Sequence, residues 1–236
     1  MRLRAIMAVA AAFSLTAATA PADPKDPKNP TCPFSPNWST NRQMQFTVKV
    51  IDGAHVLTGE GAIDNGLLPR LQQALKSDAD ISEIWLRSPG GIAAVGNAAG
   101  TFIRKNYPTM ITRIPAGWTC FSACNFMFMG GRARIVDPGG VFMVHMFTQV
   151  ADREGVKADI QDDPDGAVDM IGEIEQDAAL LASDDNDFLI RMGISRKLLT
   201  EIMYRQKALE GTGADKSTRR CLTQEEMTRY GVTNAS

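Results

Sequence analysis

Residues 86–92 read LRSPGGI, the end of an apolar run followed by a serine-proline turn and two glycines. The apolar residues from Ile81 to Leu86 predict a short strand, which the turn ends abruptly. An amphipathic helix is expected over residues 92–107, and Pro108 closes it because proline disfavours helical backbone at the residue before it. A strand, a glycine turn and a helix in this order are typical of proteins in which helices cover a β-sheet.

Strands and helices alternate on both sides of this turn. Apolar runs predict strands at residues 46–51, 54–63, 81–86, 110–114, 134–136 and 141–145. Apolar spacing of three and four residues predicts helices at residues 67–75, 92–107, 167–193, 195–206 and 223–230, and residues 122–129 form a buried apolar segment. The order predicts an α/β domain over residues 45–236, with a largely parallel sheet and a helical C-terminal part from about residue 151.

Charge and composition narrow the function. The 236 residues include 25 basic and 27 acidic side chains, so there is no basic excess, and we expect no nucleic-acid partner. A hydrophobic content of 44% excludes a disordered chain. Between Asp152 and Asp187 there are 13 acidic residues against Arg153 and Lys157, which we interpret as a solvated helical face.

The first twenty residues have the pattern of a secretory signal peptide. Arg2 and Arg4 precede an apolar run at residues 5–15, and the small residues Ala18 and Ala20 form a signal-peptidase site. The apolar run is too short to span a bilayer comfortably, and no second long one follows. The sequence therefore predicts an exported protein, periplasmic or secreted, with no membrane span in its mature form.

Residues 21–44 are expected to form an extended arm. Proline recurs at every third position from Pro21 to Pro36, which matches the three residues per turn of polyproline II. A disordered leader with no role is the alternative, because polar prolyl segments bury little surface. Cys32 within the arm favours its attachment to the body of the protein.

Four cysteines, an even number in an exported chain, indicate disulfides. Three pairings are possible, and our hypothesis joins Cys32 with Cys221, closing the arm onto the body, and Cys120 with Cys124. A zinc site is the rival, but neither a Cys-x-x-Cys motif nor paired histidines are present. We therefore expect no metal and no cofactor.

Two turns carry the residues best suited to chemistry. Residues 88–92 and 119–124 each precede a predicted helix, so their main-chain N–H groups can stabilise negative charge on a carbonyl oxygen. The second turn presents the hydroxyl of Ser122, and His145 ends an apolar strand 23 residues later, in a position to accept the serine proton. Alternatively, Ser122 only caps a helix and His145 is a structural histidine of the core.

Together these motifs resemble the Clp protease proteolytic subunit and its exported relatives in the ClpP/crotonase superfamily. The resemblance covers residues 59–232, and its pieces follow the family's order at residues 61–63, 86–91, 96, 122–131, 134, 143–145 and 222–232. It implies a spiral of β-β-α units. It also implies a serine peptidase, and because no ATP-driven unfoldase accompanies an exported protein, short or unfolded peptides are the expected substrates.

The resemblance assigns roles to residues of both turns. By resemblance, Ser122 stands at the position of the family's nucleophile and His145 at the position of its general base, which implies an acyl-enzyme mechanism. The main-chain N–H groups of Gly90 and Ala123 are similar to the oxyanion hole of the family.

Partners are implied as well. Gly91 and Ile92 are similar to residues that pair with an extended peptide, so a peptide or an unfolded protein is the expected substrate. The family assembles into rings or trimers through helical extensions, so the helices after Val150 predict a homo-oligomer. The sequence does not fix the number of subunits.

One member of the catalytic triad departs from the family pattern. Arg219 stands where the family has a catalytic aspartate, and the nearest acid is Asp215. A peptide-binding or assembly protein with weakened catalysis on the same fold is therefore the alternative to a peptidase. A crotonase-type reaction ranks last, because acyl-CoA is scarce outside the cytoplasm. A serine-lysine dyad would have to use Lys157, which lies in an acidic stretch and not on a motif.

Overall fold

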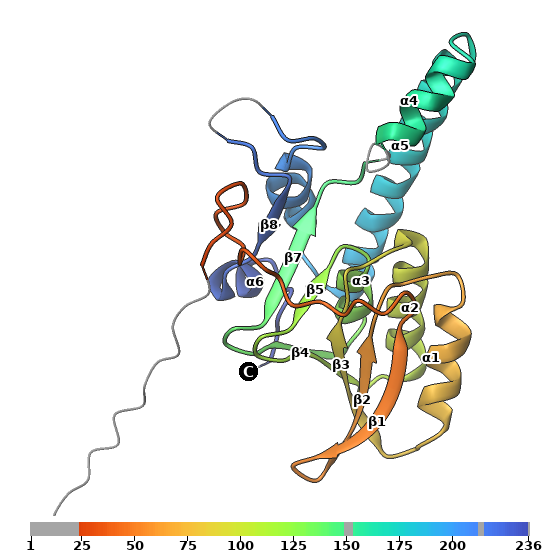
Figure 1. Cartoon of the computed structure of the whole chain (residues 1–236). Coiled ribbons are helices and arrows are strands. Elements are labelled where there is room, and N and C mark those ends of the chain that lie inside the picture. Colours follow the sequence, from red (N-terminus) through yellow and green to blue (C-terminus); the bar gives the residue numbers. More distant parts are fainter. Residues whose placement is uncertain (1–23, 149–152, 212–214, 236) are drawn as a thin grey trace, which may run out of the picture.

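The computed structural model describes residues 24–148, 153–211 and 215–235. The predicted signal peptide at residues 1–20 lies outside this part of the chain. Strands and helices alternate along the described residues, which confirms the predicted α/β class. Figure 1 shows the sheets at the centre of the molecule and a long helical hairpin that projects from them.

The larger sheet has five strands in the order β1-β2-β3-β4-β6. The strands are β1 Gln45–Ile51, β2 Ala54–Glu60, β3 Ile81–Arg87, β4 Ile111–Ile114 and β6 Ala133–Val136. β1 and β2 form an antiparallel hairpin, whereas β2, β3, β4 and β6 pair in parallel. Parallel neighbours need crossover connections, which the helices supply. The predicted largely parallel sheet is therefore confirmed.

A second sheet of three strands carries the predicted catalytic residues at its ends. It consists of β5 Thr119–Phe121, β7 Val141–His145 and β8 Arg219–Cys221, in the order β5-β7-β8. β5 runs parallel to β7, and β8 runs antiparallel to it. An isolated bridge between Ser88 and Cys120 connects the end of β3 with β5. The glycine turn after β3 and the serine turn after β5 therefore lie next to each other.

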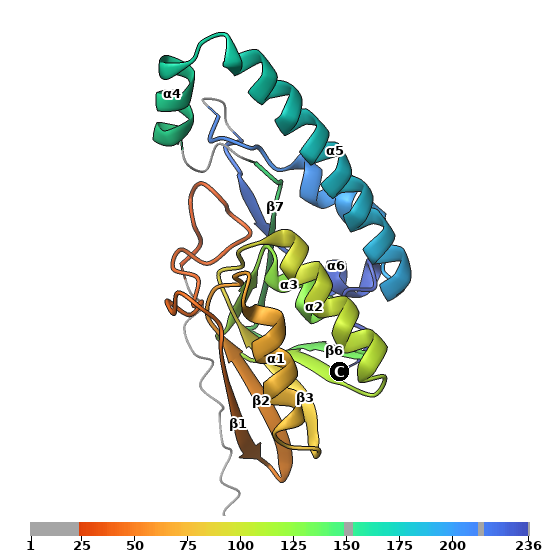
Figure 2. The same ribbon diagram turned by 90° about the vertical axis from the view of Figure 1, so that its right-hand side faces the viewer.

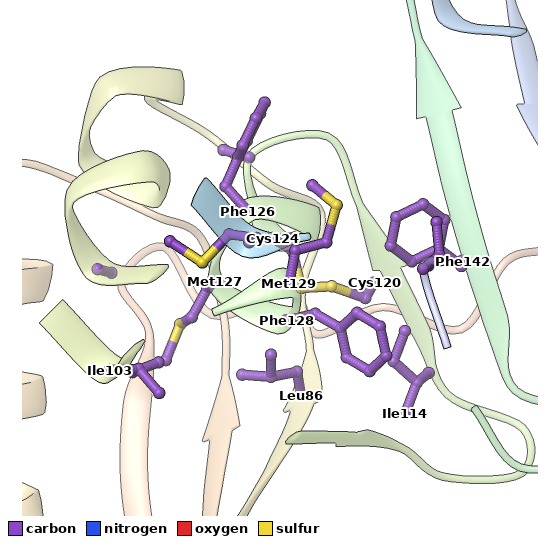
Figure 3. Packing of buried hydrophobic residues seen from close by; sticks show 14 of the residues in the cluster. Leu86, Ile103, Ile114, Cys120, Cys124, Phe126, Met127, Phe128, Met129 and Phe142 are labelled. Atoms are coloured by element: carbon purple, nitrogen blue, oxygen red, sulfur yellow. A yellow bond between two sulfur atoms is a disulfide. The ribbon is translucent and has the colours of Figure 1, made fainter. Parts of the chain in front are cut away.

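Helices cover one side of the larger sheet (Figure 2). They are α1 Leu67–Lys76, α2 Ala93–Asn106 and the short α3 Cys124–Met129. All six residues of α3 are buried, and all but Asn125 are apolar. Figure 3 shows how Phe128 of α3 packs in one core with Leu86 of β3 and Ile103 of α2. The core therefore lies directly beneath the serine turn.

The C-terminal region is helical, as predicted. α4 Arg153–Asp162 and α5 Gly166–Met192 form a hairpin that extends away from the sheets (Figures 1 and 2), and the short helix α6 Gln224–Arg229 follows later. α4 has no buried residue, whereas the last turns of α5 bury Phe188 and Leu189 completely. None of the helices in the described residues combines the length and the apolar character needed to cross a bilayer.

Three short elements differ from the sequence-based expectations. The helix predicted over residues 195–206 is instead a π-helical turn, Leu198–Ile202, followed by a 3₁₀ turn, Met203–Arg205. Its apolar side chains are buried as the spacing predicts, so only the hydrogen-bond pattern differs. Neither β5 nor β8 is predicted from the sequence, because each has three residues and β8 reads Arg-Arg-Cys, with no apolar alternation.

The described part of the predicted arm is only partly extended. Residues 24–34 fold back into a loop that a bridge between Lys25 and Pro33 closes. Residues 36–44 then run past β5 to the start of β1 (Figure 1). Because the loop buries the Cys32 side chain completely, tertiary contacts override the local polyproline preference.

Both disulfides of our hypothesis are present. The Cα atoms lie 5.0 Å apart in the Cys32–Cys221 pair and 5.4 Å apart in the Cys120–Cys124 pair, within the usual range for a disulfide. The first disulfide ties the arm to β8. The second spans the serine turn, and Figure 3 shows it among the buried side chains of the core.

Removing the Cys32–Cys221 disulfide should destabilise the protein more than removing the Cys120–Cys124 disulfide. The two cysteines are 189 residues apart in the first pair and 4 in the second. Closure of these loops in the unfolded chain predicts losses in the free energy of unfolding of about 5 and about 2 kcal/mol. Urea unfolding of the two double Cys→Ser variants measures both losses. Equal losses would contradict the loop-length argument.

Candidate active site

Ser122 occupies a tight turn between β5 and α3. Its φ of 56° is left-handed, a conformation that few residues other than glycine adopt. The Ser122 N–H donates to the Met143 C=O at 3.3 Å, and the Ser122 C=O accepts from the Asn125 N–H at 2.9 Å. The buried Asn125 side chain also donates to the Met143 C=O at 2.6 Å. These contacts and the Cys120–Cys124 disulfide hold the strained turn.

His145 is the last residue of β7 and lies beside the Ser122 turn. β7 pairs in parallel with β5 and places Met143 opposite Phe121. Ser122 and His145, which follow these two residues, therefore lie at the same edge of the sheet. The His145 Nε2 lies 2.7 Å from the Ser122 Oγ, a hydrogen-bond distance. The Phe121 ring packs against the imidazole with a centroid separation of 4.8 Å. The structure therefore brings together the serine and the histidine selected from the sequence.

The surroundings of His145 favour the neutral imidazole. Burial is the main effect and lowers the pKa of His145 from its ordinary value of 6.5, while a hydrogen bond with the Met146 main chain acts in the opposite direction. Only a neutral imidazole can accept a proton. At neutral pH His145 therefore has the protonation state that a general base needs.

The strand next to His145 carries a cation in place of an acid. β8 pairs with β7 and puts Arg219 opposite His145. The Arg219 Nη2 donates to the Asp26 Oδ2 at 3.0 Å. The hydrogen bond from the Asn29 side chain is the main reason why the pKa of Asp26 falls to about 2 despite its burial. Asp26 is therefore charged at neutral pH and neutralises Arg219, a pairing that sequence spacing could not reveal.

In the described part of the chain, no carboxylate hydrogen-bonds the His145 ring. Asp215, the weaker sequence candidate for the third catalytic residue, lies on an exposed loop and accepts a hydrogen bond from the Ser217 N–H at 3.0 Å. The geometry among the described residues is thus that of a serine-histidine pair, with the carboxylate of a triad missing.

The two amides predicted as an oxyanion hole belong to neighbouring turns. Gly90 has a φ of 86°, and a Cβ added to it would lie 2.6 Å from the Ser122 Cβ and 3.1 Å from the Ala123 N. The Gly90 and Ala123 main chains are therefore adjacent beside the hydroxyl-bearing residue. The Gly90 N–H donates to the Ser88 Oγ at 3.0 Å, so it must exchange this partner before it can bind a substrate oxygen.

Gly91 and Ile92 differ in what they can offer an extended peptide. Gly91 forms a parallel bridge with Ile63. The Ile92 N–H donates to the Ile63 C=O at 3.0 Å, and the Ile92 C=O accepts from the Gly96 N–H at 3.1 Å. Main-chain pairing of a peptide at Ile92 is therefore not available in this structure, and only its side chain can contact a ligand. Gly91 directs its own N–H and C=O to the edge opposite Ile63.

A mostly apolar cavity of about 300 Å³ opens beside the Ser122–His145 pair. It is lined by Gly91, Ile92, Ala93, Ser122, Ala123, Phe126, His145, Phe147, Thr148, Leu181, Asp185, Met203 and Tyr204. An apolar cavity with a few polar groups that converge on it is the usual form of a ligand site. The sequence did not point to Leu181, Asp185, Met203 or Tyr204, because they come from C-terminal elements that carry no motif.

Among the described residues, one cluster of potential metal ligands lies at the opposite end of β2 from the glycine turn. The donor atoms of His55, Asp78 and Asp80 lie within 4.8 Å of one another. The His55 Nδ1 is 2.5 Å from the Asp78 Oδ2, and this contact raises the pKa of His55. We interpret the cluster as a partly exposed ion pair.

Comparison of the chain with known proteins identifies its fold. No protein-family model matches the sequence, and no curated protein is significantly similar to it. Among solved structures, a mutant of ClpP1 from Listeria monocytogenes is 15% identical and covers 76% of this chain and 89% of that chain, with a TM-score of 0.50. A mutant of 1510-N, a membrane-bound stomatin-specific protease, is 13% identical and covers 76% of each chain, with a TM-score of 0.47. The match to ClpP1 shows that the chain has a ClpP-like fold.

Proposed function

We propose that this protein is an exported serine peptidase that hydrolyses short or unfolded peptides through an acyl-enzyme. The observation that carries the proposal is the 2.7 Å contact between the Ser122 Oγ and the His145 Nε2 at the mouth of an apolar cavity. The two disulfides are compatible with export, because such bonds persist in oxidising compartments.

Acylation starts when the Ser122 Oγ attacks the carbonyl carbon of a peptide bond and the His145 Nε2 takes the hydroxyl proton. The carbonyl oxygen becomes negative, and the amides of Gly90 and Ala123 donate to it once the Gly90 N–H has left the Ser88 Oγ. The tetrahedral intermediate then expels the amine, which receives its proton from His145. An ester between Ser122 and the substrate acyl group remains.

Deacylation reverses the roles. His145 removes a proton from water, the resulting hydroxide attacks the ester, and the same two amides stabilise the second oxyanion. Collapse of this intermediate releases the carboxylic acid product, and the proton on His145 returns to the Ser122 Oγ. Gly91 is the residue best placed to hold the peptide main chain, since its N–H and C=O face away from Ile63.

A peptide-binding or assembly protein with weakened catalysis is the second candidate. The observation that favours it is Arg219, which stands opposite His145 and bonds Asp26 rather than orienting the imidazole. In a well-studied triad enzyme, loss of a properly placed carboxylate lowers kcat by about ten-thousandfold, so the lack of one beside His145 among the described residues favours weak catalysis. Peptide binding without turnover, unchanged by His145→Ala, would support this candidate.

Self-association is part of the proposal. The projecting α5 helix exposes apolar side chains on its outer turns, with Val168 72%, Ile171 56% and Leu180 56% exposed. Val168 and Ile171 are three residues apart and share one face of the projecting helix, and exposed apolar side chains on one face are typical of an interface. We propose that this helix joins copies of the chain into a homo-oligomer.

Labelling with a fluorophosphonate tests the proposed peptidase. The reagent phosphonylates a serine hydroxyl only where a base activates it, so the wild-type protein should be labelled at neutral pH and Ser122→Ala should not. Peptide mapping must place the label on Ser122. Absence of labelling in a correctly folded, disulfide-bonded protein would reject the peptidase and leave the binding protein.

A further inference from the structure

The cavity beside Ser122 contains a carboxyl group that the mechanism does not use. Asp185 of α5 lines the cavity and is only 5% exposed. Its Oδ1 is buried, and no described residue hydrogen-bonds it. No ion pair of the described residues includes Asp185. A buried carboxyl group is normally paired or neutralised by protonation, so an unpaired one at a cavity wall is available to a cationic ligand.

Asp185 is not a displaced triad acid. No hydrogen bond of the described residues joins Asp185 to His145: the His145 Nε2 contacts the Ser122 Oγ, and the Asp185 Oδ1 has no partner. Desolvation, followed by the charge of the neighbouring Asp184, raises the pKa of Asp185 to about 7. Burial raises the pKa of Tyr204 to about 12, and the charge of Asp185 adds to this increase. Asp185 therefore belongs to the cavity wall and not to the serine-histidine pair.

The rest of the wall around Asp185 suits an aliphatic or aromatic chain. Phe126, Leu181 and Met203 supply apolar surface to the same cavity. A lysine or arginine side chain has an apolar stem and a charged end, and it would place the stem along these residues and the charge at the carboxylate. A volume of about 300 Å³ accommodates one such side chain.

We propose that Asp185 is a specificity-determining residue that binds the cationic group of a substrate, so that peptide bonds next to a lysine or an arginine react preferentially at Ser122. This inference rests on the proposed peptidase function. Without a ligand in the cavity, Asp185 is partly protonated near neutral pH, which reduces the free-energy cost of burying it. An ammonium or guanidinium group that binds there stabilises the carboxylate form.

The first experiment needs no catalysis. Calorimetry compares benzamidine, a cationic aryl amidine, with benzamide, its neutral analogue of the same shape. Wild-type protein should bind benzamidine at least about tenfold more tightly, as expected of a charge-assisted hydrogen bond. Asp185→Asn should remove this difference. Asp187→Asn, which neutralises an exposed carboxylate of the same helix, is the matched control and should retain it.

The second experiment compares the hydrolysis of three peptides. The first has an acetylated N-terminus and a lysine before the scissile bond, and the second has an acetylated N-terminus and a norleucine at that position. The third has the norleucine and a free N-terminal amine. The acetylated lysine peptide should have the highest kcat/KM. Asp185→Asn should lower its preference over the acetylated norleucine peptide by about tenfold to a hundredfold, whereas Asp187→Asn should retain the preference. Preference for the unacetylated peptide would assign Asp185 to the chain terminus and overturn the side-chain proposal.

The outcomes separate the two proposals. Labelling and hydrolysis without any preference for lysine, together with equal binding of benzamidine and benzamide, would reject the role of Asp185 and leave the peptidase. Selective benzamidine binding that Asp185→Asn abolishes, in a protein that is never labelled, would support a cation site on a binding protein. Asp185→Ser provides a second variant without the charge if the asparagine disturbs the packing of α5.

Discussion

Replacing His145 with alanine should lower the rate of acylation of Ser122 by about a hundredfold to ten-thousandfold, the usual contribution of a general base. The imidazole is the one base in hydrogen-bond contact with the Ser122 Oγ among the described residues, at 2.7 Å. Without it the hydroxyl keeps its proton and remains a poor nucleophile. Stopped-flow measurement with a fluorophosphonate or an activated ester gives the rate directly.

The pH dependence of the same rate adds a second signature. Since His145 must be neutral to act, the wild-type rate should rise with pH through the pKa of His145 and be constant above it. Burial lowers that pKa from 6.5, so the rise should lie at lower pH than for an ordinary histidine. His145→Ala should lose this rise.

The other histidine provides the control. His55 is partly exposed, binds Asp78 and lies on β2, so His55→Ala should keep both the rate and the pH profile. If His145→Ala retained wild-type kinetics while its thermal unfolding was unchanged, His145 would not be the base. The binding-protein alternative would then be preferred.

Gly91→Ala should cost about 2 to 6 kcal/mol of the free energy of unfolding, because strain and a collision coincide at this position. The φ of Gly91 is 146°, which side chains rarely permit, and an added Cβ would lie 2.1 Å from the Ile63 O. The Ile63 main chain cannot yield easily, because its C=O and N–H both bond to the glycine turn.

A second glycine separates the two contributions. Gly117 also has a positive φ, 75°, but an added Cβ would have no neighbour within 4 Å. Gly117→Ala should therefore cost only about 1 kcal/mol, from backbone strain alone. Urea unfolding of both variants measures the difference. Similar losses for Gly91→Ala and Gly117→Ala would show that the close approach of Ile63 is not important.

Much of the larger sheet could be predicted from the sequence, because its strands carry strong local signals. The hairpin of residues 46–63 and the apolar strand from Ile81 are bounded by glycines or charged residues. The helices that connect the parallel strands show apolar spacing of three and four residues. β8 could not be predicted, since its three residues become a strand only by pairing with β7 and by the disulfide of Cys221. Pairing of this kind is a property of the fold, not of the local sequence.

The candidate site divides in the same way. Ser122 and His145 were selected because each follows an apolar segment, and parallel strands bring such ends to one edge. Asp185 was hidden in a run of acidic residues that we interpreted as a solvated helical face. That interpretation is wrong for Asp185, which is buried because the end of α5 packs on the body of the protein through the Phe126–Phe188 contact.

The disulfide between the arm and β8 imposes an order of events on biosynthesis. A chain made from its N-terminus presents the thiol of Cys32 long before its partner, 189 residues later, has been translated. Cys120 and Cys124 emerge in between, and an oxidant of an oxidising compartment can take two electrons from Cys32 and either of them to form a wrong disulfide unless they have already joined each other. Early joining of that local pair thus acts as a safeguard against scrambled isomers, and correct closure must wait until nearly the whole polypeptide has been made.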